Sequence, residues 1–191
     1  MKLHELIREY YPQYYSIEHY PAKRTVALCK VADEWGIFSN FASTPIEYEG
    51  ITFDCGERLF HYLKFHSDAA EGKAELMAAH GGQALKMRMK HIAKAHPEWL
   101  REDWGAVVVD IMKHCLLLKY QQSPVFRNAL EQSKGRYIVE DQTSFPIKEA
   151  NTWGTKLVGD EYIGPNLLGR LLMELRENPE KFAQGIAHMK L

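Results

Sequence analysis

The sequence predicts a single domain of the α+β class that is predominantly α-helical, with a small β-hairpin or sheet near the N-terminus. From Cys55 onward, apolar residues recur mainly at the helical spacings of three and four. Two short alternating runs on either side of Glu49-Gly50 are instead typical of a β-hairpin. The chain has 191 residues, of which 46% are hydrophobic, and no repeat or linker divides it. This length and composition favour one well-sized core.

The N-terminal part is expected to differ from the rest. Residues 1–24 are predicted to be an extension, with a short helix within residues 2–15 and an irregular segment after it. Residues 25–191 are predicted to be the main domain. Within that domain, the β-branched stretch at residues 25–31 predicts a strand, and residues 45–54 predict the hairpin.

The remaining elements are mostly helices. The helical patterns cover residues 57–69, 73–81, 83–95, 104–122, 123–135 and 166–178. The pattern at residues 123–135 begins with serine and proline and ends at glycine, which are typical helix start and stop signals. Residues 136–140 predict a short strand, and residues 151–165 predict a glycine-rich loop.

Composition and charge limit the partners. The net charge is −1 and the sequence pI is about 6.8, so the overall charge attracts neither nucleic acid nor a membrane. The cysteines are Cys29, Cys55 and Cys115, an odd number without framework spacing, which indicates free thiols in a reducing compartment. The first residues lack the pattern of a secretory signal, and no apolar run is long enough to span a bilayer. We therefore expect a cytoplasmic protein without membrane contact.

Several common catalytic motifs are absent from the sequence. It contains no GxGxxG, no Walker A motif, no HExxH, no paired CxxC and no GxSxG. These absences argue against a phosphate-cradling glycine loop, a metal site and nucleophilic acyl transfer. We therefore expect no metal and no cofactor.

One helical stretch, "CGERLFHYLKF" at residues 55–65, gathers polar and aromatic groups. The residues that share one helical face are Glu57, Phe60, His61 and Lys64. Glu57 and Lys64 are separated by roughly 10 Å along the helix axis, which suits two groups that hold different parts of a nucleoside-sized ligand. The alternative is a capping box in which Asp54 is the N-cap and Glu57 bonds back to it, with Lys64 solvated.

Three predicted loops carry residues of the kind that bind flat ligands. Asn40 lies between two phenylalanines, Trp153 precedes a glycine, and Asn166 starts a helix one turn before Arg170. Each has a structural alternative. Trp153 is also typical of a core anchor, Asn166 of an N-cap, and Arg170 of a surface ion pair.

Five ordered blocks between Glu34 and Glu177 resemble the NADAR superfamily, also called the YbiA-like family, which includes riboflavin-biosynthesis-intermediate N-glycosidases. The blocks are "GIFSNF", "GERLFHYLKF", "REDWGAVVVDIMKHCLLLKY", "YIVE" and "TWGTKLVGDEYIGPNLLGRLLMELRE". The sequence departs from the family pattern at Gly56, Arg58, His61 and Ala150, the last of which stands where the family has an aspartate. The loop after Trp153 is also longer than in the compact bacterial members.

The resemblance implies a YbiA-like domain that hydrolyses the N-glycosidic bond of a ribosylated, nucleotide-like small molecule. The implied substrates are ADP-ribosyl-guanine and a phosphoribosylamino-pyrimidine of riboflavin synthesis, either free or attached to nucleic acid. The alternative is a non-catalytic module that binds ADP-ribose or a related nucleotide, and the loss of the aspartate at Ala150 favours it.

The resemblance also implies roles for individual residues. Glu57 would stabilise an oxocarbenium-like ribose or activate water. Lys64 would hold a phosphate or act as an amine nucleophile, and Glu149 would replace the missing aspartate unless it lies on a solvated loop. The residues expected to bind substrate are Phe38, Asn40, Phe41, Phe60, His61, Trp104, Trp153, Gly154, Asn166 and Arg170.

Overall fold

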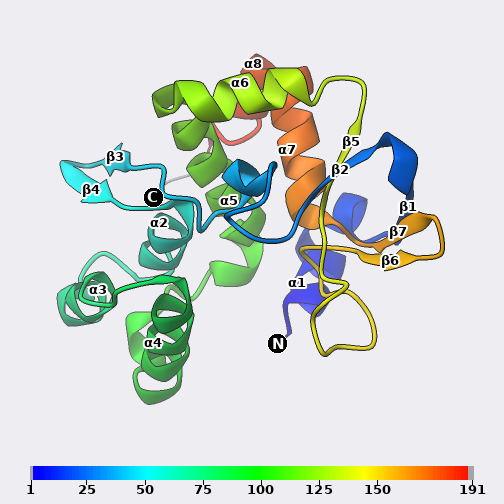
Figure 1. Cartoon of the computed structure of the whole chain (residues 1–191). Helices are drawn as coiled ribbons and strands as arrows, with labels where there is room; N and C mark the ends of the chain where they lie inside the picture. Colours follow the sequence, from blue (N-terminus) through cyan, green and yellow to red (C-terminus); the bar gives the residue numbers. More distant parts are fainter. Residues whose placement is uncertain (1, 189–191) are drawn as a thin grey trace.

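The longest helix, α5 (Trp104–Gln122), runs through the middle of the molecule, and most other helices pack against it (Figure 1). The computed structural model describes residues 2–188. The helices in contact with α5 are α1 (Leu3–Tyr10), α2 (Gly56–Tyr62), α6 (Pro124–Gln132), α7 (Leu167–Glu177) and α8 (Pro179–Gln184). Two further helices, α3 (Ala70–Met77) and α4 (Gly82–Ala95), pack on each other beside α2.

The strands form three small sheets. The largest has the antiparallel order β1 (Glu18–Pro21), β7 (Glu161–Gly164), β6 (Lys156–Val158). The second is a parallel pair, β2 (Thr25–Leu28) with β5 (Tyr137–Glu140). The third is the hairpin of β3 (Ile46–Tyr48) and β4 (Ile51–Phe53). Its turn residues Glu49 and Gly50 have φ values of 49° and 77°, as a tight hairpin turn requires.

Many of the predicted elements are confirmed. Helix α5 has the predicted bounds, the hairpin turns at the predicted dipeptide, and β2 and β5 lie where the short β-branched runs predicted strands. Helix α6 follows Ser123, whose hydroxyl accepts a hydrogen bond from the backbone amide of Phe126 at 3.2 Å, as predicted for an N-cap.

The β structure is more widely distributed than predicted. The glycine-rich segment 151–165 contains β6 and β7, and the supposedly irregular segment before residue 24 contains β1. In the largest sheet, Glu18 pairs with Gly164, so two segments far apart in the sequence form one strand pair. Local patterning does not signal such long-range pairing. The helix predicted at residues 57–69 is also shorter, because α2 ends at Tyr62.

One main hydrophobic core includes residues of the N-terminal segment. Ile7, Tyr11 and Tyr14 are buried in it, and the Tyr11 hydroxyl donates to the backbone oxygen of Ala106 at 2.5 Å. The segment before residue 25 therefore packs on the same core as the rest of the chain. A smaller buried cluster lies beneath α3 and α4. Within residues 2–188, no helix has the length and apolar character needed to cross a membrane.

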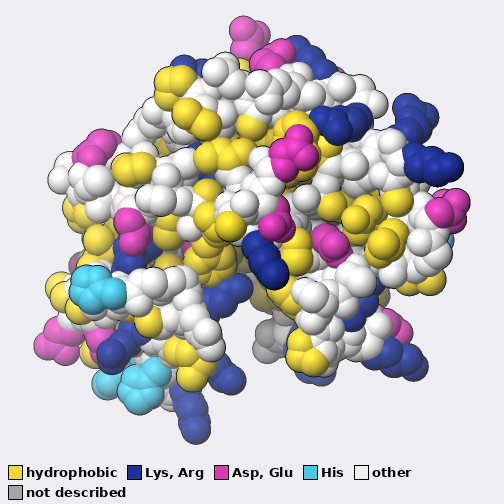
Figure 2. All heavy atoms as spheres, in the orientation of Figure 1, with side chains coloured by type: hydrophobic (Ala, Val, Ile, Leu, Met, Phe, Trp, Pro, Cys, Tyr) yellow, Lys and Arg dark blue, Asp and Glu magenta, His cyan; other side chains and the backbone are white. Residues whose placement is uncertain are grey.

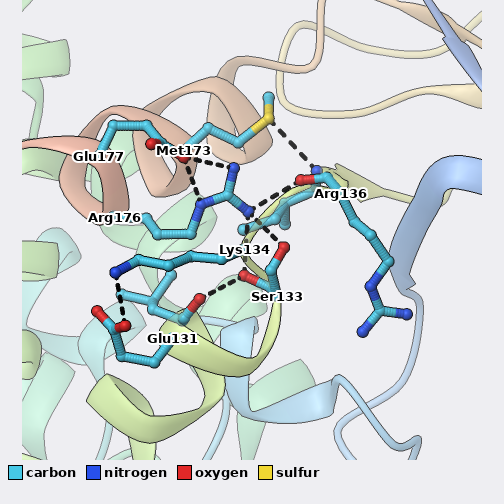
Figure 3. A network of polar contacts seen from close by, with 9 residues as sticks. Glu131, Ser133, Lys134, Arg136, Met173, Arg176 and Glu177 are labelled. Atoms are coloured by element: carbon cyan, nitrogen blue, oxygen red, sulfur yellow. Dashed lines mark hydrogen bonds and ion pairs between the residues drawn. The ribbon is translucent and has the colours of Figure 1, made fainter.

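Helix α7 fixes the position of β5. Arg176 on α7 donates to the backbone oxygens of Ser133 at 2.8 Å and Arg136 at 2.9 Å, which lie in the turn before β5 (Figure 3). At the other end of α7, Asn166 Nδ2 donates to the Ile138 oxygen at 2.9 Å, and its Oδ1 accepts from the Glu140 amide at 3.2 Å. These bonds hold the strand whose last residue is Glu140.

Candidate active site

A cavity of about 160 Å³ lies where the start of α2 meets the end of β5, and it is called the central cavity here. Its polar and aromatic lining includes Asn40, Phe41, Glu57, Phe60, Lys86, Glu140 and Trp153. The structure therefore brings together Glu57, Asn40 and Trp153, which the sequence analysis expected to meet at one site. They come from three separate regions of the chain.

The start of α2 leaves the Glu57 side chain available to this cavity. Cys55 is the N-cap residue and makes no side-chain capping bond. Asp54 instead pairs with Arg58 through contacts of 2.6 and 2.9 Å. The capping-box interpretation of Asp54 and Glu57 is therefore wrong, because Asp54 is used by Arg58. The Glu57 amide is satisfied by the backbone oxygen of Asn40 at 2.9 Å, and its side chain is only 14% exposed.

A second cavity of about 460 Å³ adjoins the first and shares Glu57 and Lys86 with it. It is called the cationic cavity here, because four of its lining side chains are basic: Lys64, Lys86, Lys90 and Arg101. His61 and Trp104 also line it. Figure 2 shows the surface hollowed between α4 and the loop after β5, with Lys and Arg side chains along the α4 side of the hollow. This concentration of positive charge is suited to an anionic group.

Lys64 is not an ordinary solvated lysine. Its ammonium nitrogen lies 4.9 Å from the ring centroid of Phe60 and 4.9 Å from that of Trp104, which is cation–π geometry. Burial lowers the pKa of Lys64 to about 8, although the charge of Glu57 opposes the shift. A lysine with such a pKa is present near physiological pH partly as the charged ammonium and partly as the neutral amine, which can act as a nucleophile.

The two carboxyl groups of the central cavity have opposite pKa shifts. Burial acts to raise the pKa of Glu57, but the His61 ring and the charges of two lysines outweigh it and the net shift is downward. Burial raises the pKa of Glu140 to about 7, and the negative charge of Glu57 adds to this rise. At neutral pH Glu57 is thus ionised while Glu140 is substantially protonated, which is the arrangement that separates a base from an acid.

Two polar side chains near Glu57 have unused hydrogen-bonding capacity. Asn40 Nδ2 contacts the Met112 sulfur at 3.0 Å, but its buried Oδ1 has no hydrogen-bond partner among the described residues. His61 Nε2 lies 3.2 Å from Glu57 Oε1, and neither ring nitrogen makes a hydrogen bond of regular geometry within residues 2–188. Burial, with the charge of Lys64, lowers the pKa of His61, although Glu57 opposes the shift. Buried polar atoms normally have partners, so these atoms are available to a ligand.

Glu140 and Lys86 were not among the residues expected from the sequence to act at the site. The "YIVE" block contains Glu140, but nothing local shows that this glutamate ends a strand beside α2. Lys86 is an exposed residue of α4 whose ammonium lies 4.5 Å from the Phe41 ring centroid. A glutamate at the end of an apolar strand was the one signal that could have identified the second carboxylate.

Four of the residues expected to bind substrate make contacts within the fold. Phe38 is 0% exposed and packs on Trp35 and Phe126 in the core. Asn166 is also fully buried, and its amide is occupied by the backbone of β5. A Cβ at Gly154 would lie 2.6 Å from the Glu140 oxygen, so this glycine lets the Trp153 loop approach β5. Arg170 bonds to the N-terminal segment.

Glu149 does not line the central cavity that contains Glu57. It is exposed and lines a third cavity, of about 780 Å³, between the 149–153 loop and the N-terminal segment. This third space is called the N-terminal cavity here. The carboxylate that lines the central cavity beside Glu57 is therefore Glu140, whereas Glu149 lines the N-terminal cavity. Trp153 lines both the central and the N-terminal cavity and forms their common boundary.

Comparisons with known proteins identify the family of the domain. The sequence profile of the NADAR domain matches residues 28–178. The chain is 27% identical over 161 residues to the N-glycosidase YbiA of Escherichia coli (strain K12), covering 84% of this chain and 92% of that protein. It is 28% identical over 160 residues to the chloroplastic riboflavin biosynthesis protein PYRR of Zea mays, covering 79% of this chain and 24% of that protein.

A solved structure shows the same fold. The NMR structure of the E. coli protein YbiA matches with a TM-score of 0.60 and 27% sequence identity, covering 87% of this chain and 89% of that one. The helical α+β arrangement and this structural match define a domain of the YbiA type. The profile match covers most of the chain, and the protein belongs to the NADAR domain family.

Proposed function

We propose that this protein hydrolyses the N-glycosidic bond of a ribosylated, phosphate-bearing small molecule. The observation that carries the proposal is the pair of carboxyl groups in the central cavity, Glu57 and Glu140, whose pKa values are shifted in opposite directions beside a cationic cavity. The similarity to proteins named N-glycosidases supports the same reaction class.

Glu57 acts at the sugar. Breaking the bond between the ribose C1′ and a nitrogen leaves positive charge on the ring, as in other glycoside hydrolases. The ionised carboxylate of Glu57 stabilises this charge and takes a proton from the water that attacks C1′. The unpartnered Oδ1 of Asn40 accepts a hydrogen bond from a ribose hydroxyl or from that water.

Glu140 acts at the leaving group. As the C1′–N bond breaks, its electron pair goes to the nitrogen, and the protonated Glu140 donates a proton to the departing base or amine. The products are the free nitrogen compound and a ribose with a hydroxyl at C1′. The proton that Glu57 takes from water balances the one that Glu140 gives, so the net reaction consumes one water.

Phosphate binds in the cationic cavity. Positive charge is supplied there by Lys86, Lys90 and Arg101. Lys64 and Glu57 line the same cavity. Lys64 has two possible roles, which differ in chemistry. As an ammonium it holds the phosphate. As a free amine it attacks C1′ of the ring-opened substrate and expels the nitrogen leaving group, which takes up a proton; the Schiff base left between Lys64 and C1′ is then hydrolysed by water.

The proposed substrates are a phosphoribosylamino-pyrimidine of riboflavin synthesis and ADP-ribosyl-guanine. The similarity to proteins named for riboflavin biosynthesis supports the first. Both contain a phosphate, a ribose and a nitrogen-linked flat ring, which match the basic, acidic and aromatic parts of the site. Phe41 and Trp153 both line the central cavity, and Trp153, which also lines the N-terminal cavity, provides an aromatic ring on which the flat ring stacks.

Incubation with both substrates, followed by mass spectrometry of the released ring, tests the proposal. ADP-ribosylated guanosine is supplied both free and within a single-stranded oligonucleotide. We expect release from at least one compound by the wild type and by Glu71→Gln, an exposed glutamate of α3 that serves as the matched control. Ligand-dependent thermal stabilisation without release would instead identify a binding module.

A further inference from the structure

About half of the residues that line the N-terminal cavity lie outside the family match. One wall comes from residues 3–17, whereas the NADAR profile begins at residue 28. The opposite wall is the 149–153 loop, which ends at Trp153. The cavity of about 780 Å³ falls within the range of roughly 300–1,000 Å³ that is typical of ligand pockets.

The N-terminal wall is held in place by specific contacts. The Arg170 guanidinium donates to the Gln13 backbone oxygen at 2.5 Å and to Ser16 Oγ at 3.1 Å, and it lies 5.2 Å from the Tyr14 ring centroid. The Tyr14 hydroxyl donates to Glu174 at 2.8 Å. Helix α7 therefore anchors the segment, so the cavity is pre-formed.

The central cavity is too small for a whole nucleotide. Its volume of about 160 Å³ lies below the range of roughly 300–1,000 Å³ that holds most small ligands. A ribose whose C1′ lies at Glu57 must therefore extend its two substituents into neighbouring spaces. The central cavity shares lining residues with the cationic cavity on one side and with the N-terminal cavity on the other.

The linings of those two neighbours differ in charge. The cationic cavity has four basic residues. Among the described residues that line the N-terminal cavity there is no lysine or arginine, and its one carboxylate is Glu149. Its aromatic and aliphatic members are Leu3, Ile7, Tyr14, Tyr15, Ile17, Ala150, Trp153 and Pro165. This composition disfavours a phosphate and suits an uncharged aromatic ring.

Two residues of the N-terminal wall expose apolar surface to the cavity. Tyr15 is 45% exposed and Ile17 is 59% exposed, and both line the cavity. We propose that the N-terminal cavity binds the uncharged aromatic heterocycle of the substrate, with the heterocycle held between Trp153 and the Tyr15–Ile17 wall. This inference rests on the proposed function for the orientation of the substrate, and it assigns residues 3–17 a part in substrate selection.

The test compares ligands with and without a heterocycle. Binding of ribose 5-phosphate and of the four ribonucleoside 5′-monophosphates is measured by calorimetry for the wild type, Tyr15→Ala and Ile17→Ala. Tyr10→Ala is the matched control, because Tyr10 is a similarly exposed tyrosine that does not line the cavity. Melting temperatures confirm that each variant is folded.

We expect at least one nucleotide to bind the wild type about tenfold more tightly than ribose 5-phosphate, a typical gain from base stacking on aromatic rings. Tyr15→Ala and Ile17→Ala should each reduce that difference severalfold without changing the Kd of ribose 5-phosphate, and Tyr10→Ala should change neither value. Equal binding of ribose 5-phosphate and all four nucleotides by the wild type would overturn the inference. An unchanged difference in both cavity variants would do the same.

The outcome is distinguishable from failure of the proposed function. If heterocycle-dependent binding is lost in the cavity variants but the wild type releases no base from any compound, the catalytic proposal fails and the binding site stands. If base is released and the variants retain wild-type kcat/KM on every substrate, the catalytic proposal stands and the N-terminal site is rejected.

Discussion

Glu57 and Glu140 line the same cavity, yet the pKa of Glu57 is lowered and that of Glu140 is raised to about 7. The difference has a structural origin. Glu57 is beside His61 and within the field of Lys64 and Lys86, whereas Glu140 is half-buried at the end of β5 with Glu57 as a negative neighbour. Two carboxyl groups in such different surroundings are suited to the roles of base and acid.

Replacing Glu57 should remove catalysis and leave the fold intact. Glu57→Gln keeps the shape of the side chain but removes its charge, so kcat/KM should fall by about 10² or more. Glu57 caps no helix, so the melting temperature should change little. Steady-state kinetics and thermal denaturation check both points, with Glu71→Gln as the control. Retained activity with a large loss of stability would show that Glu57 has a structural role.

The pH dependence of activity should show whether Glu140 protonates the leaving group. If its protonated form donates to the leaving group, activity should fall as pH rises through about 7, and Glu140→Gln should lower kcat and abolish that alkaline limb. Substrates with a good leaving group should be less affected by the substitution. An alkaline limb that persists unchanged in Glu140→Gln would assign it to another group.

Stability provides a second, activity-independent test of Glu140. Because its folded pKa is raised from 4.5 to about 7, the folded state binds the proton more tightly, and stability should decrease as pH rises between these values. Glu140→Gln removes this effect, so the variant should gain melting temperature relative to the wild type at pH 8 compared with pH 5. A constant difference at both pH values would contradict a raised pKa.

Substitution of Lys64 should show whether this lysine holds the phosphate by its charge or forms a covalent bond with the substrate. If it forms a Schiff base, borohydride should trap a covalent adduct with the wild type, and Lys64→Arg should be inactive and untrappable. If it only holds charge, Lys64→Arg should keep substantial kcat and mainly raise KM. Mass spectrometry of the intact protein reports the adduct, and Lys94→Arg, at an exposed position of α4, is the control. An active wild type that cannot be trapped excludes the covalent role.

Asn166 should affect both stability and activity, because its amide fixes the position of the strand that ends at Glu140. Asn166→Ala leaves the Ile138 oxygen and the Glu140 amide without their buried partners, at about 1–3 kcal/mol for each group. We therefore expect the free energy of unfolding to fall by about 2–5 kcal/mol and kcat to fall with it. Urea denaturation measures the first effect. Asn128→Ala, at an exposed position of α6, should change stability by less than about 0.5 kcal/mol.

The sequence predicted those parts of the site that depend on local spacing. The shared face of Glu57, His61 and Lys64 follows from helical periodicity, and these residues do line one cavity. Family blocks also placed Asn40 and Trp153 at the same site as Glu57. Spacing alone did not distinguish a ligand-facing stripe from a capping box. The pairing of Asp54 with Arg58 in the structure excludes the capping box.

The remaining parts depend on contacts between distant segments. The burial that raises the pKa of Glu140 follows from the pairing of β5 with β2 and from the approach of the Trp153 loop, which no local pattern encodes. Asn166 was expected to be a ligand residue because its type is suited to hydrogen bonding. Its left-handed conformation, with φ of 52°, instead directs its amide to the backbone of β5. The pairing of β1 with β7 escaped prediction for the same reason.

The most direct test of the central claim is a single-turnover reaction in heavy-oxygen water with the compound from which the wild type releases base. Hydrolysis at Glu57 and Glu140 predicts one heavy oxygen atom in the ribose product and none in the released base, detected by mass spectrometry. Glu57→Gln should slow both the release and the incorporation by about 10² or more. Binding of the ribosylated compounds without any release, or release that is unchanged in Glu57→Gln, would contradict the account.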